Sequence, residues 1–174
     1  MGFTFNGIHS DNYKIGVTAI NHVAKPAKRV TQLTIPGRHG TYDITDNTYD
    51  NITIKIDCVY IGYDYRDAAR NIAAWLSGAG ELILDTEPGK RYMANAYAAI
   101  DTTETGVLTD FSISFCCKPY AISDIKEEKT TITDNKQTLV ITSNGNVATP
   151  TKIYLKNTGD APVTGIKITI KKRC

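Results

Sequence analysis

The sequence predicts a mainly β protein of the α+β class, in which one helix packs on a sheet or partial barrel. Apolar and polar residues alternate with a period of two in several segments, one other segment has helical spacing, and turn signals separate these segments. The 174 residues are 41% hydrophobic and 22% charged, an ordinary globular composition for a chain long enough to bury one sizeable core. We therefore expect a folded β domain.

Two segments carry the clearest strand pattern, because every second residue in them is apolar. The apolar positions are Ile52, Ile54, Ile56, Cys58 and Tyr60 in the first segment, and Phe111, Ile113, Phe115 and Cys117 in the second. This alternation predicts antiparallel strands with one face on the core. Near the end of the chain, Ile166, Ile168 and Ile170 repeat the pattern. Weaker strand patterns lie at residues 28–35, 41–45, 81–85, 91–99, 138–142 and 151–156.

Residues 64–77 predict the single helix. Their apolar residues recur at helical spacing, at Ala68, Ala69, Ile72, Ala73 and Leu76. Asp64 is expected to cap the amino end, where a carboxylate also suits the helix dipole. Gly78 and Gly80 are expected to end the helix. Trp75, the only tryptophan, is expected to anchor the helix as an ordinary core residue.

A turn signal at residues 36–40 predicts a hairpin that joins residues 28–35 to residues 41–45. Its few large apolar residues are Val30, Leu33, Ile35, Tyr42 and Ile44. The hairpin is therefore too polar to be buried within its own subunit. Free strand edges invite uncontrolled pairing, so a hairpin that reaches the next copy of the chain would satisfy them. An ordinary surface hairpin explains the pattern equally well.

Other turn and composition signals divide the rest of the chain. A Pro-Gly pair at residues 88–89 predicts a second hairpin, formed by residues 81–85 and 91–99. Residues 102–110 are expected to be a polar connector. The charged residues 123–137 are weakly patterned, which indicates a linker or the entry to another domain.

The residues that carry chemistry elsewhere do not form a known site here. Four cysteines, Cys58, Cys116, Cys117 and Cys174, make no Cys-x-x-Cys pair, and Cys116 and Cys117 would point to opposite faces of a strand. His9, His22 and His39 have no metal-ligand spacing, and no nucleophile elbow or phosphate-binding glycine motif occurs. We expect no enzyme activity, no metal and no cofactor.

Charge and hydropathy argue against nucleic acid and membranes as partners of this chain. The formal net charge of +2 argues against nucleic acid as a specific partner. Ion pairs across a subunit contact explain the basic cluster of Lys25, Lys28, Arg29 and Arg38 at least as well as phosphate binding. No apolar run approaches the ~20 residues that span a bilayer, and residues 1–20 carry no secretion signal. We expect synthesis and assembly in a cytoplasm, without a membrane partner.

Four weak motifs, in one order across residues 3–120, resemble siphophage distal tail proteins. The motifs are the opening Phe3-Thr4-Phe5-Asn6-Gly7, the turn Ile35-Pro36-Gly37-Arg38-His39-Gly40-Thr41, the stretch from Trp75-Leu76-Ser77-Gly78 to Pro88-Gly89-Lys90-Arg91-Tyr92, and Phe111-Ser112-Ile113-Ser114-Phe115 with Cys117-Lys118-Pro119-Tyr120. The resemblance implies a split β-barrel or sandwich with one packed helix and a protruding belt hairpin. It also implies a hexameric ring in the tail of a phage or prophage virion.

The resemblance further implies partners and interface residues. The ring would be the hub between the tail-tube protein and the tail tip, where a tail-associated lysin or receptor-binding proteins attach, and DNA would pass through its lumen. A bacterial host cytoplasm would be the place of assembly. The belt residues that would make the subunit interface are Arg29, Val30, Leu33, Ile35, Pro36, Gly37, Arg38, Gly40, Tyr42 and Ile44.

The chain departs from the family pattern after residue 125. We expect a ring-forming domain at residues 1–122, followed at 123–174 by a linker and a partial or truncated β domain. About 50 residues are too few for a complete sandwich of ~100 residues, so sugar binding is not assigned. Two alternatives remain at this point: a tail-tube subunit, which shares the barrel, and a carbohydrate-binding module of a host-adhesion device.

Overall fold

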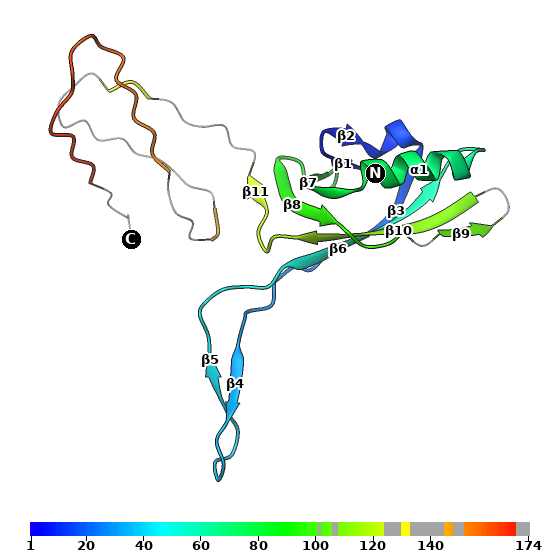
Figure 1. Cartoon of the computed structure of the whole chain (residues 1–174), viewed down its shortest axis with the longest axis horizontal. Coiled ribbons are helices and arrows are strands. Elements are labelled where there is room, and N and C mark those ends of the chain that lie inside the picture. Colours follow the sequence, from blue (N-terminus) through cyan, green and yellow to red (C-terminus); the bar gives the residue numbers. More distant parts are fainter. Residues whose placement is uncertain (101, 106–107, 124–129, 133–144, 148–151, 170–174) are drawn as a thin grey trace. The chain divides into compact units, whose positions relative to one another are not determined.

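The computed structural model describes residues 1–100, 102–105, 108–123, 130–132, 145–147 and 152–169. The chain forms two units, Met1–Thr131 and Ile132–Cys174. All strands and helices named below belong to the first unit (Figure 1). The predicted division into residues 1–122 and 123–174 stays a prediction.

The first unit contains a nine-stranded antiparallel sheet, which we call the body together with its helices. The path through the sheet is β2-β1-β7-β8-β10-β6-β3, with β11 beside β8 and β9 beside β10. The strands are β1 (Phe3–Phe5), β2 (Ile8–His9), β3 (Ile15–Asn21), β6 (Ile52–Tyr60), β7 (Gly78–Leu84), β8 (Lys90–Ala96), β9 (Thr102–Thr105), β10 (Leu108–Cys117) and β11 (Ile122–Ser123). One α-helix, α1 (Tyr65–Trp75), and a short 3₁₀ helix, Ser10–Tyr13, complete it. The mainly β fold with one α-helix is confirmed.

The long strand β10 is where the sheet splits. One edge of β10 pairs with β6 from Thr109 to Cys117. The other edge pairs with β9 at one end, over Leu108–Phe111, and with β8 at the other end, at Cys116 and Cys117. β10 therefore holds two separate groups of strands together.

The core lies on one face of β6 and β10, as the alternation predicts. Ile54, Ile56 and Phe115 are fully buried, whereas Lys55 and Ser114 between them point outward. Residues from the other strands and from α1 complete the same cluster: Phe3, Phe5, Ile15, Ile72, Trp75, Leu76, Leu82, Leu84, Tyr92 and Ala94. Burial of this much apolar surface is the main stabilising term of the body.

Trp75 attaches α1 to the sheet. Its indole ring stacks on Phe3, with ring centroids 5.5 Å apart, and on Tyr13, with centroids 4.7 Å apart. The indole Nε1 donates a hydrogen bond to the carbonyl oxygen of Phe5, at 2.9 Å. Both the apolar surface and the single polar atom of the indole are therefore satisfied, and its predicted anchoring role is confirmed.

The predicted ends of the helix need correction. Asp64 occupies the N-cap position, but its side chain makes no capping hydrogen bond, and its ψ of 63° is not the extended geometry of a usual cap. The helix ends at Trp75, before Gly78 and Gly80, which belong to β7. Gly78 has a φ of +84°, so it still serves the change of direction after the helix.

Five strands were not predicted from the sequence pattern: β1, β2, β3, β9 and β11. β3 lacks a clean alternation because its register with β6 shifts between Val17 and Ala19. The prediction of a polar connector at residues 102–110 is wrong, because β9 and the start of β10 occupy most of that range. Pairing with the long strand β10 outweighs the polar composition of the segment.

The strand predictions for the end of the chain are not met in the part that the structure describes. Residues 152–169 are exposed and contain no strand, so the predictions at 151–156 and 166–170 are wrong for their described residues. Alternation marks a strand only where another strand pairs with it. The strand predicted at 138–142 lies outside the described residues. At the start of the expected linker, β11 pairs with Lys90 and Arg91 of β8.

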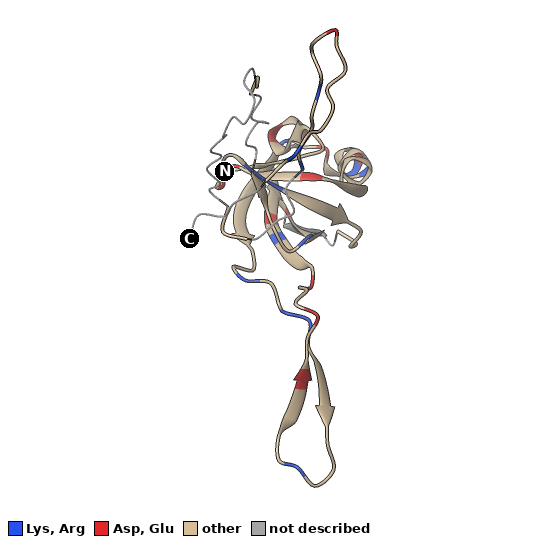
Figure 2. Ribbon diagram, turned by 90° about the vertical axis from the view of Figure 1, so that its left-hand side faces the viewer, with Lys and Arg blue, Asp and Glu red and all other residues tan. Residues whose placement is uncertain are grey.

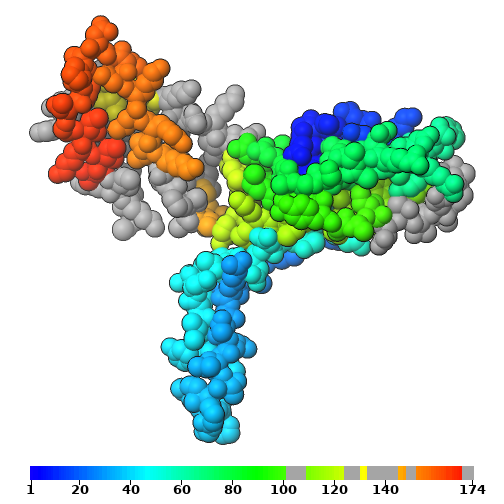
Figure 3. Space-filling model, in the orientation of Figure 1, coloured from blue at the N-terminus to red at the C-terminus, as the bar shows by residue number. Residues whose placement is uncertain are grey.

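The predicted hairpin between residues 28 and 45 is confirmed. It consists of β4 (Thr31–Thr34) and β5 (Thr41–Ile44), which form a separate two-stranded sheet. We call residues 22–51, between β3 and β6, the arm. Figure 1 shows the arm leaving the body where β3 ends and β6 begins, and Figure 3 shows it as a narrow projection.

Candidate functional site

The side chains of the hairpin β4–β5 and its tip lie in solvent within the single chain. Each belt residue named from the sequence is exposed, including Arg29, Pro36, Gly37, Arg38 and Gly40. The exposed fractions of the large apolar side chains are 42% for Val30, 51% for Leu33, 38% for Ile35, 58% for Tyr42 and 51% for Ile44. Figure 2 shows charged residues of both signs along the backbone of the arm. The arm is therefore exposed, and it lies outside the core of its own subunit.

The turn at the tip of the arm depends on glycine. Gly37 and Gly40 have φ values of +81° and +80°, in the left-handed region that glycine tolerates best. The backbone N–H of Arg38 donates to the carbonyl of Ile35, at 3.1 Å. The Pro-Gly signal in the sequence therefore corresponds to an ordered tip.

The register of the arm gives it two different faces. Leu33 pairs with Tyr42 and Thr31 with Ile44, so these side chains share one face. The intervening pairs share the opposite face, and they are all polar: Gln32 with Asp43, and Thr34 with Thr41. The Gln32 amide Nε2 donates to Asp43 Oδ1, at 3.2 Å. The arm is thus amphipathic although both faces are exposed.

Hydrogen bonds hold together residues 27–30 and 45–50, which we call the stem of the arm. The Arg29 guanidinium Nε donates to Asp50 Oδ1, at 2.7 Å, and this bond raises the pKa of Arg29. The backbone N–H of Arg29 donates to the carbonyl of Thr48, and that of Asp50 to the carbonyl of Ala27, both at 2.9 Å. The stem therefore keeps a defined form without burial in the body.

A second set of contacts lies within the part of the stem that follows β5. The Thr48 hydroxyl and backbone N–H both donate to Asp46 Oδ1, at 2.6 and 2.9 Å, and they lower the pKa of Asp46. Sequence reasoning missed the roles of Asp46 and Asp50. Both residues follow β5, and two acidic residues in a segment that returns past the basic Arg29 were the available signal.

Three contacts between described residues join the base of the arm to the body, one of them a hydrogen bond from Asn51 Nδ2 to Cys116 Sγ, at 3.5 Å. The ring of Tyr49 meets that of Tyr120, just after β10, edge to face with centroids 5.8 Å apart. His22 Nε2 lies 3.6 Å from a carboxylate oxygen of Glu87, in the turn between β7 and β8. Tyr92 also donates its hydroxyl to Glu87, at 2.5 Å, and this bond is the largest cause of the lowered pKa of Glu87. These long-range contacts had no signal in the sequence.

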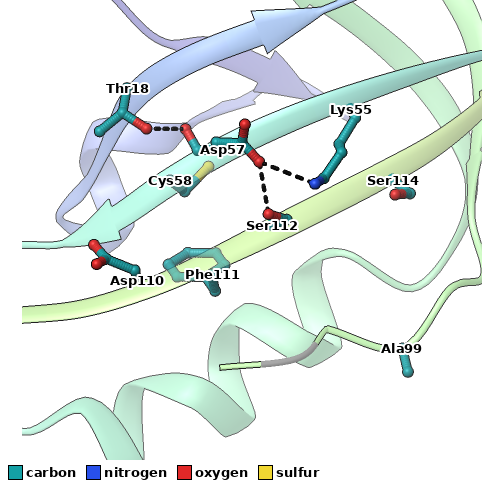
Figure 4. A pocket seen from close by; sticks show the side chains of 9 residues that line it. All are labelled: Thr18, Lys55, Asp57, Cys58, Ala99, Asp110, Phe111, Ser112 and Ser114. Atoms are coloured by element: carbon teal, nitrogen blue, oxygen red, sulfur yellow. Dashed lines mark hydrogen bonds and ion pairs between the residues drawn. The ribbon is translucent and has the colours of Figure 1, made fainter. Parts of the chain in front are cut away.

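The outer face of the body carries a shallow polar cavity of about 520 Å³. Asp57 is its central residue: Ser112 Oγ donates to Asp57 Oδ1 at 2.6 Å, and Lys55 Nζ lies 3.5 Å from the same oxygen (Figure 4). These contacts, led by the Ser112 hydrogen bond, lower the pKa of Asp57. A carboxylate satisfied in this way is a poor general base. The arrangement is a hydrogen-bonded polar surface of the sheet.

The cysteines follow the faces of their strands. Burial raises the pKa of both Cys58 and Cys117 to about 12, so neither is a thiolate nucleophile at neutral pH. Cys116 is exposed, on the opposite face from Cys117, as predicted. Cys174 lies outside the described residues.

Among the described residues, no group of three or more His, Cys, Asp or Glu side chains could hold a metal ion. The histidines lie apart: His9 contacts Asp85 and Asp11, His22 contacts Glu87, and His39 is exposed near the arm tip. None of the helices in the described part of the chain is both long and apolar enough to span a membrane. The exposed arm is therefore the candidate functional site of this chain.

The split antiparallel sheet with one packed helix and a projecting hairpin is a RIFT-related β fold of the kind found in phage tails. The chain belongs to the phage tail protein RIFT-related domain family, whose model matches residues 10–117. It is therefore a structural component of a phage tail, and the resemblance drawn from the sequence motifs is confirmed.

A solved structure shows the same fold. The chain is similar to the Dit protein (gp 19.1) of phage SPP1, with a TM-score of 0.62 and 15% sequence identity. Its crystal structure is described as a paradigm of the hub adsorption apparatus in phages that infect Gram-positive bacteria. The match covers 70% of this chain and 51% of that protein, so this chain corresponds to about half of its length. No curated protein matches this chain in sequence.

Proposed function

We propose that this chain is a distal tail protein whose copies form a ring, the hub between the tail tube and the tail tip. The exposed arm carries the proposal: its apolar side chains have no place in the core of their own subunit. Family membership and the fold shared with SPP1 Dit support the same role.

In this proposal the arm of each subunit binds the next subunit. The arm is a sheet of only two strands, so each strand has one edge that pairs with no other described strand. Main-chain hydrogen bonds across a contact are each worth a net ~1 kcal/mol, and apolar burial adds to them. A head-to-tail contact of this kind generates a closed ring when the rotation between subunits closes.

The proposed interface consists of the belt residues predicted from the sequence. They are Arg29, Val30, Leu33, Ile35, Pro36, Gly37, Arg38, Gly40, Tyr42 and Ile44. The proposed assembly is a hexamer, built in the host cytoplasm and incorporated in the virion tail. Its partners would be the tail-tube protein and the lysin or receptor-binding proteins of the tip, and its role would be structural, without enzyme activity.

The experiment that tests this proposal changes the arm alone. Replacing Val30 and Leu33 with aspartate should leave a folded monomer and abolish the ring, because charged side chains cannot be buried in an apolar contact. Light scattering gives the mass, circular dichroism checks the fold, and electron microscopy shows the particles. An intact ring in the double variant would refute the role of the arm, and long tubes from the unmodified protein would identify a tail-tube subunit instead.

A further inference from the structure

In the proposed ring, the arm of one subunit binds a surface of the next subunit. The two faces of the arm restrict the kind of surface that can bind it. Leu33, Tyr42 and Ile44 lie on one face with Thr31, and the paired residues on the opposite face are all polar. An arm that added to a neighbour only through its strand edges would need no difference between its faces. The amphipathic pattern indicates that the arm lies with one face against an apolar surface.

A matching apolar surface lies at the far end of the body. Tyr63, in the loop between β6 and α1, is 99% exposed, and Ile61 beside it is 64% exposed. Val59 extends this surface along β6 on the face opposite the core. We call Gly16, Val59, Ile61 and Tyr63 the shelf.

Gly16 keeps the shelf flat. A Cβ atom added at Gly16 would lie 3.0 Å from Ile61 Cδ1 and 3.2 Å from Val59 Cγ1, closer than ordinary contacts. Without that atom, the side chains of Ile61 and Val59 both lie close over Gly16 of β3. A low surface of this kind accommodates a second β layer better than a surface interrupted by a side chain.

The arm and the shelf occupy opposite ends of the same strand. The arm enters β6 at Ile52, and the shelf begins at Val59, near the other end. At ~3.3 Å per residue, the seven residue steps from Ile52 to Val59 separate them by roughly 23 Å. Each subunit can therefore present its arm to one neighbour while its shelf receives the arm of another, as a head-to-tail ring requires.

Charge agrees with this pairing at the edge of the contact. Arg38 lies at the arm tip, and its guanidinium has no ion pair among the described residues. Asp64 follows Tyr63 directly, and its carboxylate does not cap the helix that it precedes. Opposite charges at the rim of an apolar contact favour one orientation of docking.

We infer that the face of the arm formed by Thr31, Leu33, Tyr42 and Ile44 docks on the shelf of a second copy of this chain. The opposite face of the arm, with Gln32, Thr34, Thr41 and Asp43, stays in solvent. This inference rests on the proposed function and adds to it which face of the arm is buried and which surface receives it.

Disulfide trapping tests the inference in the full chain. Cys116 and Cys174 are first replaced with serine, so that oxidation reports only the introduced pair. The variant Leu33→Cys with Tyr63→Cys should form a ladder of covalent multimers on a non-reducing gel, because the two sulfurs would meet between subunits. The matched control, Thr34→Cys with Tyr63→Cys, differs only in the face of the arm and should stay monomeric on the same gel.

The outcomes separate this inference from the proposed ring. If electron microscopy shows rings but Leu33→Cys traps no more multimer than Thr34→Cys, the docking inference is overturned and the ring remains. If the parent protein forms no assembly at all, both fail. A second pair of variants tests the inference without disulfide trapping. In light scattering, the Leu33→Asp protein should be monomeric, and the Thr34→Asp protein should still assemble. Equal assembly of the two proteins would overturn the inference.

Discussion

The body and the arm are built from the same alternation of apolar and polar residues, but they use it differently. In the body, one face of β6 and β10 is buried in a common core, where Ile54 and Phe115 have no exposed surface. In the arm, Leu33 and Tyr42 occupy equivalent positions on their strands and remain half exposed. An apolar position in a strand therefore identifies a face, and only the surroundings decide whether that face is filled within the chain or by another molecule.

The largest effect that this comparison predicts is on the body. Phe115→Ala should lower the free energy of unfolding by about 3–5 kcal/mol, because it leaves a cavity beside Phe3 and Phe5. Leu33→Ala should change it by less than about 0.5 kcal/mol, since Leu33 lies in solvent within the subunit. Urea unfolding followed by circular dichroism, at a concentration where the protein is monomeric, measures both. Similar losses would remove the distinction between body and arm.

A smaller effect concerns the attachment of α1. Trp75→Phe keeps an aromatic ring beside Phe3 and Tyr13 but removes the donor to the Phe5 carbonyl. A buried carbonyl without its partner costs about 1–3 kcal/mol, so the variant should unfold at lower urea concentration than the parent. An unchanged midpoint would show that the hydrogen bond contributes nothing to the anchor.

A modest pH effect is expected where the arm meets the body. The pKa of Glu87 is lowered in the folded state, first by the hydrogen bond from Tyr92, so its contribution to stability is present above about pH 4.5 and is lost as the pH falls through the folded-state pKa. Glu87→Gln should flatten the fall of the unfolding midpoint between neutral and acidic pH. Asp85→Asn, in the same turn region, is the matched control. Equal flattening by both would contradict the assignment to Glu87.

The smallest effect on global stability is expected in the stem of the arm. Arg29→Ala removes the bond to Asp50, which is exposed, so the unfolding midpoint should hardly change. Hydrogen exchange of the amides in β4 and β5 should nevertheless become faster, because the stem no longer holds the two strands in register. Lys25→Ala, with no ion pair in the described part of the chain, should leave that exchange unchanged. A large fall in the midpoint would place the stem inside the cooperative unit of the body.

The sequence predicted best those elements whose pattern reflects burial. β6, β10 and α1 each have one apolar face, and each was found close to its predicted place. β3 was missed because a register shift interrupts its alternation, and β9 because its residues are polar. In contrast, the alternation near Ile166 and Ile168 predicted a strand where the described chain is exposed and unpaired.

The candidate site was predictable in part. Apolar content and turn residues were enough to identify the arm and its tip. Its two faces required the register of Leu33 against Tyr42, which the sequence does not state. The contact of Tyr49 with Tyr120 joins segments far apart in the chain and depends on the finished fold. Local sequence patterns therefore predict that this segment forms an exposed hairpin. Its contacts with the body depend on the tertiary structure.

The position of Trp75 also makes its fluorescence a probe of the folding of the body. The indole is the only one in the chain, and its ring lies in a stack of aromatic side chains inside the body. Its fluorescence emission should shift to longer wavelength when the body unfolds and water reaches the ring. The arm carries no tryptophan, so ring assembly through the arm should leave that emission nearly unchanged. A single intrinsic fluorophore can thus follow folding separately from association, without a label on the arm.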